Sequence, residues 1–356
     1  EIVAAEGILK SFASFVITAG FISYGIGQLI SGFMGDRLNP KKIIFGGLIA
    51  TSVLNFLMPF GKTVPVMTII WTFNGFAQAM MWPPLVKIMS GYLSKEDFQK
   101  SCVIVAIASS AGTIAVYLLA PVMIYLSGWR LVFFVSGTFG IIISFVWVFV
   151  IRIIENHANE NTGQQHQDIT AINKDENISF KKTIASSGLV FIVIGIIMQG
   201  ILKDGVTTWL PSYIHETFHL GSSVSILSAV VLPVFSIFCF KLALYLKRRF
   251  FSNELTCAAV IFFAGFTAIV VLMLYNASSV LLSLALTSII TGSMHGVNLM
   301  LISFVPGHFN KFGNVSWISG LLNFFTYVGS ALSIYIFAKL SEIFGWQLTI
   351  FCWALI

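Results

Sequence analysis

The chain has 356 residues, of which 57% are hydrophobic and only 10% are charged. Soluble domains carry about a quarter charged residues, so this composition excludes a water-soluble fold. The formal net charge of +6 does not indicate binding to nucleic acid, because the basic residues stand between apolar runs, as they do in cytoplasmic loops. The composition predicts a protein of the lipid bilayer.

Long, nearly charge-free runs recur along the whole chain, each near the ~20 residues that a helix needs to cross the hydrocarbon core. Because no water reaches the backbone there, each run has to satisfy its own hydrogen bonds as a helix. The runs predict an all-α membrane protein with complete spans at 11–34, 43–60, 66–90, 101–126, 131–151, 187–214, 222–246, 254–275, 279–305 and 315–341, and the start of another at 346–356.

A polar turn, Gly32 to Lys42, follows the first span. Gly32 permits close approach of another helix. Asp36 is suited to cap or pair with a helix end and so to latch one conformation, with Arg37 beside it. A generic basic turn is the alternative interpretation.

The third span carries two groups of polar or proline-containing sequence. Asn74-Gly75-Phe76-Ala77-Gln78 is followed by Trp82-Pro83-Pro84, with Lys87 three residues further on. Trp82 is suited to form an apolar or stacking wall of a binding site, and Lys87 adds a positive charge to it.

Basic residues alternate between the two sides of the predicted spans, which predicts the orientation of the chain. The polar segment Glu155 to Lys182 falls on the cytoplasmic side and has the composition of a poorly ordered hinge. We therefore expect a helical bundle at 1–152, a cytoplasmic linker at 153–183 and a second bundle at 184–356. Glu1 is expected outside, so one span would precede it in a complete protein.

The two expected halves resemble each other. Ser127-Gly128-Trp129 ends one loop of the first half, and Phe344-Gly345-Trp346 ends one loop of the second. The two glycines lie 217 positions apart. Parallel repeats of this kind are typical of transporters that are built from two similar bundles.

Lys203 is a charged residue inside the span 187–214. A charge at the membrane centre costs roughly 2.5–3.5 kcal/mol on insertion scales, so a carboxylate, an anionic ligand or contact with the surface has to compensate it. Asp204 is adjacent, but neighbours on a helix point about 100° apart and are not expected to face each other. We favour contact with a substrate anion; a structural ion pair and snorkelling to the surface stay open.

Other polar residues inside apolar spans are candidates for lining a cavity, or alternatively for hydrogen bonds between helices. His295 is also a candidate for proton coupling. The candidates for the binding site are Gln199, His295, Asn298 and Asn323, with Asn74 and Gln78 as further lining.

The turn at Gly32 to Lys42 resembles the signature loop of the major facilitator superfamily, with Asn39-Pro40 where a glycine is frequent. Together with Trp82-Pro83-Pro84 and Trp209-Leu210-Pro211-Ser212-Tyr213, it looks like the organophosphate:phosphate antiporter family. That resemblance implies two pseudo-symmetric bundles of six helices, of which about eleven helices are present. The first helix and most of the last would be missing.

The resemblance implies alternating access around a midplane site, in a monomer of the plasma membrane, with phosphate antiport or cation symport as the coupling. The cargo would be a small phosphorylated or carboxylated anion. Lys203 falls where glycerol-phosphate transporters carry an arginine, Gln28 where they have a lysine and Ser109 where they have a histidine. A point charge lacks the bidentate fork of arginine, so the departure at Lys203 weakens the case for a phosphate monoester.

A receptor and an enzyme are two other classes of membrane protein. Some members of the resembled family sense a sugar phosphate instead of transporting it, and that receptor function stays an alternative. An enzyme is not expected, and neither is a metal or another cofactor. The sequence has no Gly-Lys-Ser/Thr phosphate-binding loop, which argues against ATP as the energy source.

Overall fold

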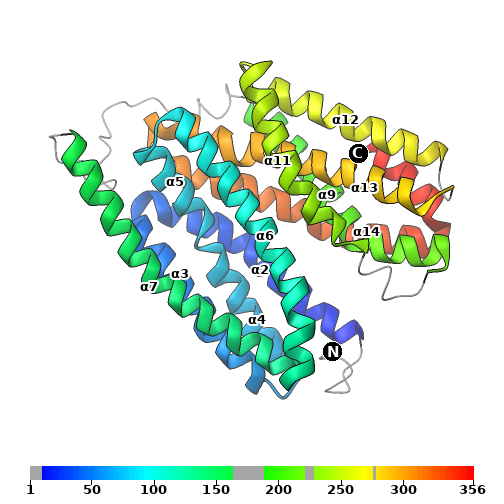
Figure 1. Cartoon of the computed structure of the whole chain (residues 1–356), viewed down its shortest axis with the longest axis horizontal. Coiled ribbons are helices and arrows are strands. Elements are labelled where there is room, and N and C mark those ends of the chain that lie inside the picture. The colour runs from blue at the N-terminus through cyan, green and yellow to red at the C-terminus, as the bar shows by residue number, and fades with distance from the viewer. Residues whose placement is uncertain (1–9, 163–187, 221–227, 276–277) are drawn as a thin grey trace. The chain divides into compact units, whose positions relative to one another are not determined.

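The computed structural model describes residues 10–162, 188–220, 228–275 and 278–356. Within these ranges the chain is all-α, as the sequence predicts. The part of the predicted linker after residue 162 lies outside the described residues. Figure 1 labels the helices, which are α2 (Lys10–Arg37), α3 (Pro40–Leu57), α4 (Val64–Ala79), α5 (Trp82–Tyr92), α6 (Lys95–Ser127), α7 (Trp129–Thr162), α9 (Leu189–Phe218), α11 (Val231–Arg249), α12 (Glu254–Leu274), α13 (Val280–Asn298) and α14 (Val315–Leu355).

The described part of each predicted span falls on one of these helices, except for 66–90, which covers both α4 and α5. Among the described residues, seven helical stretches are long and apolar enough to cross a membrane: Pro40–Phe60, Lys95–Ser127, Trp129–Ile154, Leu189–Phe218, Glu254–Leu274, Val280–Asn310 and Val315–Leu355. The other predicted spans correspond to α2, the α4–α5 pair and α11. A short 3-10 turn, Met58–Phe60, extends α3, and a π-helical stretch, Leu299–Phe304, continues α13 before a second 3-10 segment, Val305–Phe312.

The two glycines of the predicted repeat adopt the same backbone conformation. Gly128 has φ 76° between α6 and α7, and Gly345 has φ 75° within α14, where it separates two helical stretches. Side chains with a Cβ rarely adopt this conformation, so glycine allows a sharp change of helix direction at both sites. Each glycine is followed by a buried tryptophan, Trp129 or Trp346.

The predicted span 66–90 is two helices, which corrects the prediction of one. The chain leaves α4 after Ala79 and begins α5 at Trp82, with Pro83 in the first turn of α5. Proline has no N–H, so Pro83 cannot donate to the carbonyl of Ala79 four residues before it. That carbonyl instead accepts a hydrogen bond of 2.8 Å from the Ser31 hydroxyl of α2.

The described residues cluster into two compact units. Unit 1 comprises Glu1–Lys95, Leu118–Ile184 and Pro306–Phe324, and unit 2 comprises Glu96–Tyr117, Ala185–Val305 and Phe325–Ile356. The first part of α14 therefore packs with unit 1 and the rest with unit 2. The division into bundles at 1–152 and 184–356 stays a prediction.

In unit 1, α2 packs on α4 and α5, and α3 packs on α4 and α7. Small apolar clusters hold these contacts, one of them formed by Val16, Met58, Met67 and Trp129. The Lys41 ammonium donates to the Tyr92 hydroxyl at 3.0 Å, and the Trp147 indole donates to the Lys41 carbonyl at 3.2 Å. These bonds tie the polar turn after α2 to α5 and α7.

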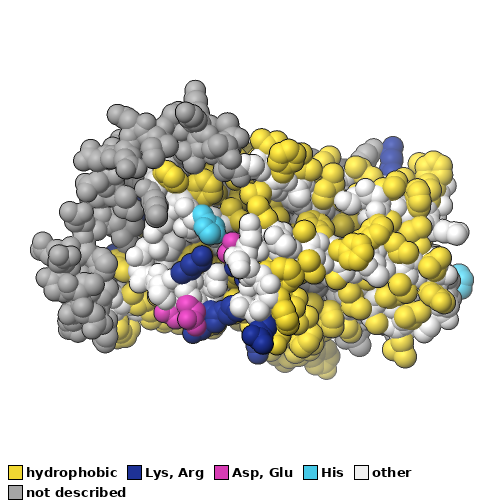
Figure 2. Space-filling view, turned by 90° about the horizontal axis from the view of Figure 1, so that it is seen from above, with side chains coloured by type: hydrophobic (Ala, Val, Ile, Leu, Met, Phe, Trp, Pro, Cys, Tyr) yellow, Lys and Arg dark blue, Asp and Glu magenta, His cyan; other side chains and the backbone are white. Residues whose placement is uncertain are grey.

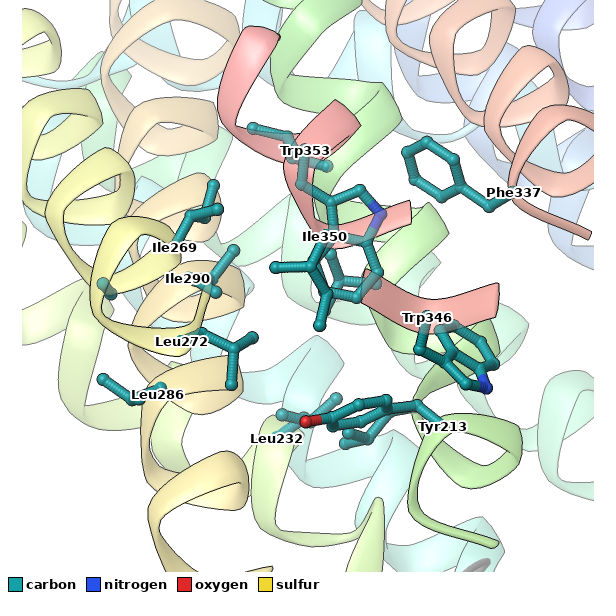
Figure 3. Close-up of a cluster of buried hydrophobic side chains, with 14 of the residues drawn as sticks. Tyr213, Leu232, Ile269, Leu272, Leu286, Ile290, Phe337, Trp346, Ile350 and Trp353 are labelled. Atoms are coloured by element: carbon teal, nitrogen blue, oxygen red, sulfur yellow. The ribbon is translucent and has the colours of Figure 1, made fainter. Parts of the chain in front are cut away.

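In unit 2, α13 packs against α9, α11 and α12. Their shared core continues into the last part of α14, and Figure 3 shows how side chains such as Tyr213, Leu272 and Trp346 converge in it. Tyr213 and Trp346 meet edge to face with ring centroids 5.4 Å apart. The Trp346 indole donates to the Glu216 carboxylate at 2.8 Å, so the polar edge of the ring has a partner.

Large apolar side chains also cover much of the outside. On α7, Phe139, Phe145 and Phe149 are each about two-thirds exposed. Figure 2 shows a face on which hydrophobic side chains predominate and charged ones gather in one area. Such surfaces are stable against lipid tails and unstable in water, in agreement with the predicted membrane location.

Two glycines let α9 and α14 touch backbone to backbone in unit 2. A Cβ on Gly200 would strike the Thr326 carbonyl, and one on Gly329 would strike the Ile197 carbonyl. Side chains of ordinary size would therefore push these helices apart. Small residues at a crossing are the usual route to tight association of helices in membranes.

Gly200→Ala and Gly329→Ala are expected to destabilise the protein by about 1–3 kcal/mol each, through overpacking of this crossing. Thermal unfolding of the purified protein in detergent measures the effect. Gly112→Ala is the matched control, because a Cβ there meets nothing within 4 Å and the change improves helix propensity. Equal behaviour of the three variants would contradict the assigned crossing.

Candidate functional site

Asp36 is bonded to the start of another helix. Its carboxylate accepts hydrogen bonds from the backbone N–H of Ser316 at 3.1 Å and of Trp317 at 2.7 Å, both in the first turn of α14. These N–H groups have no partner within their own helix, and the positive end of the helix dipole attracts an anion. The bonds join residues about 280 positions apart, all within unit 1.

Lys87 lies beside the same carboxylate. Its ammonium donates to the carbonyls of Gly35 at 3.0 Å and Asp36 at 3.2 Å, and it lies 3.8 Å from the Asp36 carboxylate. The two side chains are 4% and 8% exposed, so water screens them weakly. We call Asp36, Lys87 and the first turn of α14 the latch. The contacts of Lys87 in this structure belong to the latch, and its role as a substrate contact stays a prediction.

Glycines bring α2 and α14 close enough for the latch to form. The ideal Cβ of Gly32 would lie 2.7 Å from the Ser316 carbonyl and 3.0 Å from the Cα of Gly320. A Cβ on Gly35 would strike the Ser316 side chain. One turn away from this contact, the Asn323 amide donates to the carbonyl of the Gln28 amide at 3.3 Å.

Two predicted residues of unit 1 stand apart from these bonds. The Arg37 guanidinium lies over the Phe33 ring, 3.7 Å from its centroid, and the residue is exposed. Trp82 is partly buried at the start of α5, and its indole N–H has no hydrogen-bond partner among the described residues.

Burial raises the pKa of the Asp36 carboxyl from 3.8 to about 6. Asp36 lies just beyond the predicted span 11–34. The Trp317 N–H, the Lys87 ammonium and the Ser316 N–H favour the charged form, but they offset the loss of hydration only in part. The bonded position therefore binds a proton more readily than a carboxyl in water does.

The second group of predicted residues lies in unit 2, around Lys203 of α9. The Lys203 ammonium is 3.4 Å from the Asp204 carboxylate, with side chains 14% and 29% exposed. The expectation that these neighbours would not meet is therefore wrong, because the long lysine chain reaches around the helix. The second oxygen of Asp204 accepts a hydrogen bond from the Ser330 hydroxyl of α14.

The remaining candidates of unit 2 lie on α9 and α13. The buried Gln199 donates to the Met294 carbonyl at 3.2 Å, and its own carbonyl has no partner among the described residues. The His295 ring packs edge to face on Phe240, with centroids 5.3 Å apart, and the charges of Lys203 and Asp204 act on it. Asn298 is partly buried in the last turn of α13.

The sequence did not reveal what α14 supplies to the two sites: the N–H groups of its first turn for Asp36 and the Ser330 hydroxyl for Asp204. Ser316 and Trp317 contribute backbone N–H groups, which no side-chain pattern marks, although Gly313-Asn314 before Val315 is a recognisable helix start. Ser330 is one of many serines in apolar spans, and nothing in its spacing relates it to Asp204.

Helices that satisfy their own backbone, cover themselves with apolar side chains and pair their few internal charges define a multi-pass membrane protein. The family model of the Major Facilitator Superfamily matches residues 2–334. The chain therefore belongs to the major facilitator superfamily, which is a family of transporters and not of enzymes.

Relatives with assigned functions match over nearly the whole chain. The glycerol-3-phosphate transporter of Bacillus subtilis is 27% identical over 363 residues, covering 96% of this chain and 80% of the relative. The probable hexose phosphate transport protein of Chlamydia muridarum is 23% identical over 366 residues, covering 97% and 80%. The predicted likeness to the organophosphate:phosphate antiporter family is confirmed as a distant relationship.

A solved structure confirms the fold. The outward-facing crystal structure of a bacterial homologue of the iron transporter ferroportin aligns with a TM-score of 0.74, over 99% of this chain and 89% of that one. The identity is 12%, so the likeness concerns the fold alone. The chain has the all-helical major facilitator fold.

The raised pKa of Asp36 predicts how acid affects the bonded state. A carboxyl whose pKa is raised by folding contributes stability that is present below its ordinary pKa and is lost as the pH rises through the folded value. The unfolding midpoint of the wild type, relative to that of Asp36→Asn, should therefore fall as the pH rises from about 4 to about 6. Thermal unfolding of both proteins across this range measures it; a difference that rises with pH would contradict the assignment.

Proposed function

We propose that this secondary transporter moves a small organic anion by alternating access, with Lys203 as the group that attracts the anion. The single observation that carries the proposal is an ammonium within a membrane-crossing helix whose one carboxylate partner among the described residues is Asp204, at 3.4 Å. That distance is longer than the about 2.7–2.9 Å of a strong charge-assisted hydrogen bond. The ammonium therefore keeps bonding capacity for a second anion.

Exposure separates Lys203 from Lys87, the lysine of the latch. Lys87 is 4% exposed and donates to two carbonyls, whereas the side chain of Lys203 is 14% exposed and that of its partner Asp204 is 29% exposed. A ligand needs access, so Lys203 suits an anion site and Lys87 suits the latch. Gln199, His295 and Asn298 are proposed as further lining from α9 and α13.

The latch would hold one side of the transporter closed. Its bonds connect α2 with the start of α14, and both ends of the connection are backbone or nearly buried groups. Sliding these helices apart would leave a carboxylate and an ammonium without partners, at a cost of several kcal/mol unless water enters. We propose that this side is the cytoplasmic side of the plasma membrane, as the basic loops predict.

The relatives named for phosphorylated metabolites support an anionic cargo. Lysine offers a compact charge without the planar fork that grips phosphate through two bonds. Both phosphorylated and carboxylated metabolites therefore stay within the proposal, and so do phosphate antiport and proton symport as ways of driving it. A transporter-like receptor remains the alternative that a measured flux would exclude.

Lys203→Ala is expected to lower transport roughly tenfold to hundredfold, since a hydrogen bond to a charged group contributes about 1.5–3 kcal/mol. The measurement is counterflow of labelled glycerol 3-phosphate, glucose 6-phosphate and gluconate in proteoliposomes at equal pH on both sides. The panel covers both kinds of headgroup.

Lys203→Arg is the matched control, because it keeps the charge and should retain counterflow. Lys100→Ala removes a half-exposed lysine from α6 and should change nothing. Unaltered counterflow in Lys203→Ala would refute the anion site, and so would a wild type that moves none of the three anions.

A further inference from the structure

Asp204 is an ionisable group inside α9, and the proposed function assigns it no role. One carboxylate oxygen lies 3.4 Å from the Lys203 ammonium, and the other accepts a hydrogen bond from Ser330 of α14. The side chain is 29% exposed, so the protein does not enclose it completely. Asp204 and an anionic cargo would therefore compete for the same ammonium.

The net charge of Lys203, Asp204 and the cargo determines the result of this competition. With the site empty, Lys203 and Asp204 neutralise each other. A monovalent anion on Lys203 would leave the Asp204 carboxylate without its cation in a medium where an uncompensated charge is costly. One proton bound by Asp204 restores neutrality: the cargo takes the ammonium, and the carboxylate becomes a neutral carboxyl.

The hydrogen bonds around Ser330 accommodate both forms of Asp204. The Ser330 hydroxyl contacts Asp204 and also donates to the Thr326 carbonyl at 2.9 Å. When Asp204 is charged, the hydroxyl proton is directed at the carboxylate. When Asp204 is protonated, its new O–H donates to the Ser330 oxygen, and the hydroxyl proton is directed at Thr326 instead. The Asp204 carboxyl and the Ser330 hydroxyl therefore stay hydrogen-bonded to each other in either state.

On this basis, which rests on the proposed anion site at Lys203, we infer that Asp204 is the proton-binding residue that couples anion movement to proton movement. The protein is then an anion–proton symporter. Its preferred cargo carries one negative charge at the group that meets Lys203, as a carboxylate or a singly charged phosphate does. Anion and proton bind together and are released together, because either one alone leaves a net charge in the site.

Among the described residues, His295 of α13 is a further titratable group on which the charges of Lys203 and Asp204 act. From α14, the residues toward this part of α9 are uncharged: Ser330 at Asp204, and Ser333 with Phe337 at Gly205. His295 packs on the Phe240 ring. It is the rival proton acceptor and is tested beside Asp204.

The test uses proteoliposomes of the full chain, with the membrane voltage held at zero by potassium and valinomycin. An inward proton gradient of one pH unit should concentrate gluconate about tenfold in the wild type if one proton accompanies each anion. Glycerol 3-phosphate is run in parallel. Asp204→Asn should keep counterflow at equal pH while its accumulation ratio falls to about one.

Three further variants test whether the loss of gluconate accumulation is specific to Asp204. Glu216→Gln neutralises another carboxylate of α9, twelve residues and thus about 18 Å further along the helix, and should accumulate gluconate as the wild type does. His295→Asn changes a proposed lining residue and is expected to slow counterflow, but the accumulation ratio that it finally reaches should stay about tenfold. Asp204→Glu restores a carboxylate and should recover both counterflow and accumulation if Asp204→Asn loses counterflow.

The outcomes separate this inference from the proposed function. Counterflow without accumulation in the wild type, accumulation driven by sodium, or accumulation retained by Asp204→Asn would each overturn proton coupling through Asp204, with the transporter assignment intact. Loss of accumulation in His295→Asn alone would overturn it too, as would failure of Asp204→Glu to restore a lost counterflow. Unaltered counterflow in Lys203→Ala refutes the anion site itself.

Discussion

An ionised side chain within the apolar part of this protein needs compensation from another group, because lipid and packed side chains provide none. The chain meets this constraint in two ways. Asp36 receives two backbone N–H groups and a buried lysine, so its charge is enclosed by fixed donors. Among the described residues, Lys203 is paired with the carboxylate of its neighbour, at a longer distance and with more exposure. The first arrangement joins two helices, and the second is the one proposed to exchange its carboxylate for a solute anion.

The partners of Asp36 and Lys203 also explain why the two sites suit different tasks. A helix N-terminus is part of the backbone and cannot rotate away, so the Asp36 bonds break when α2 and α14 separate or when Asp36 itself turns aside. The Lys203 ammonium sits on a flexible chain of four carbons and can change partner without moving a helix. In the proposed function, large motions would therefore depend on the latch, whereas ligand exchange at Lys203 would require only a rotation of side chains.

Hydropathy predicted the spans well because the cost of an unsatisfied backbone in lipid leaves helices as the outcome. The match between Gly128 and Gly345 was likewise visible, since both glycines precede tryptophan, but the positive φ that they share was not predicted. Partners across the fold were not visible, because Ser330 is 126 positions from Asp204 and a backbone N–H has no sequence signature. Helix geometry alone predicted wrongly that Lys203 and Asp204 would not meet, because it describes where Cβ atoms point and not how far a long side chain reaches.

The proline at 83 has an effect beyond the interruption of its own span. By lacking a donor it leaves the Ala79 carbonyl available to Ser31 of α2. The same ring thus interrupts one helix and leaves an oxygen whose described donor lies on another. An alanine at this position would direct an N–H at that oxygen, which has two lone pairs and could accept from the N–H and from Ser31 together. With proline, the acceptor is not shared with its own helix, and the bond to the neighbouring helix uses it alone.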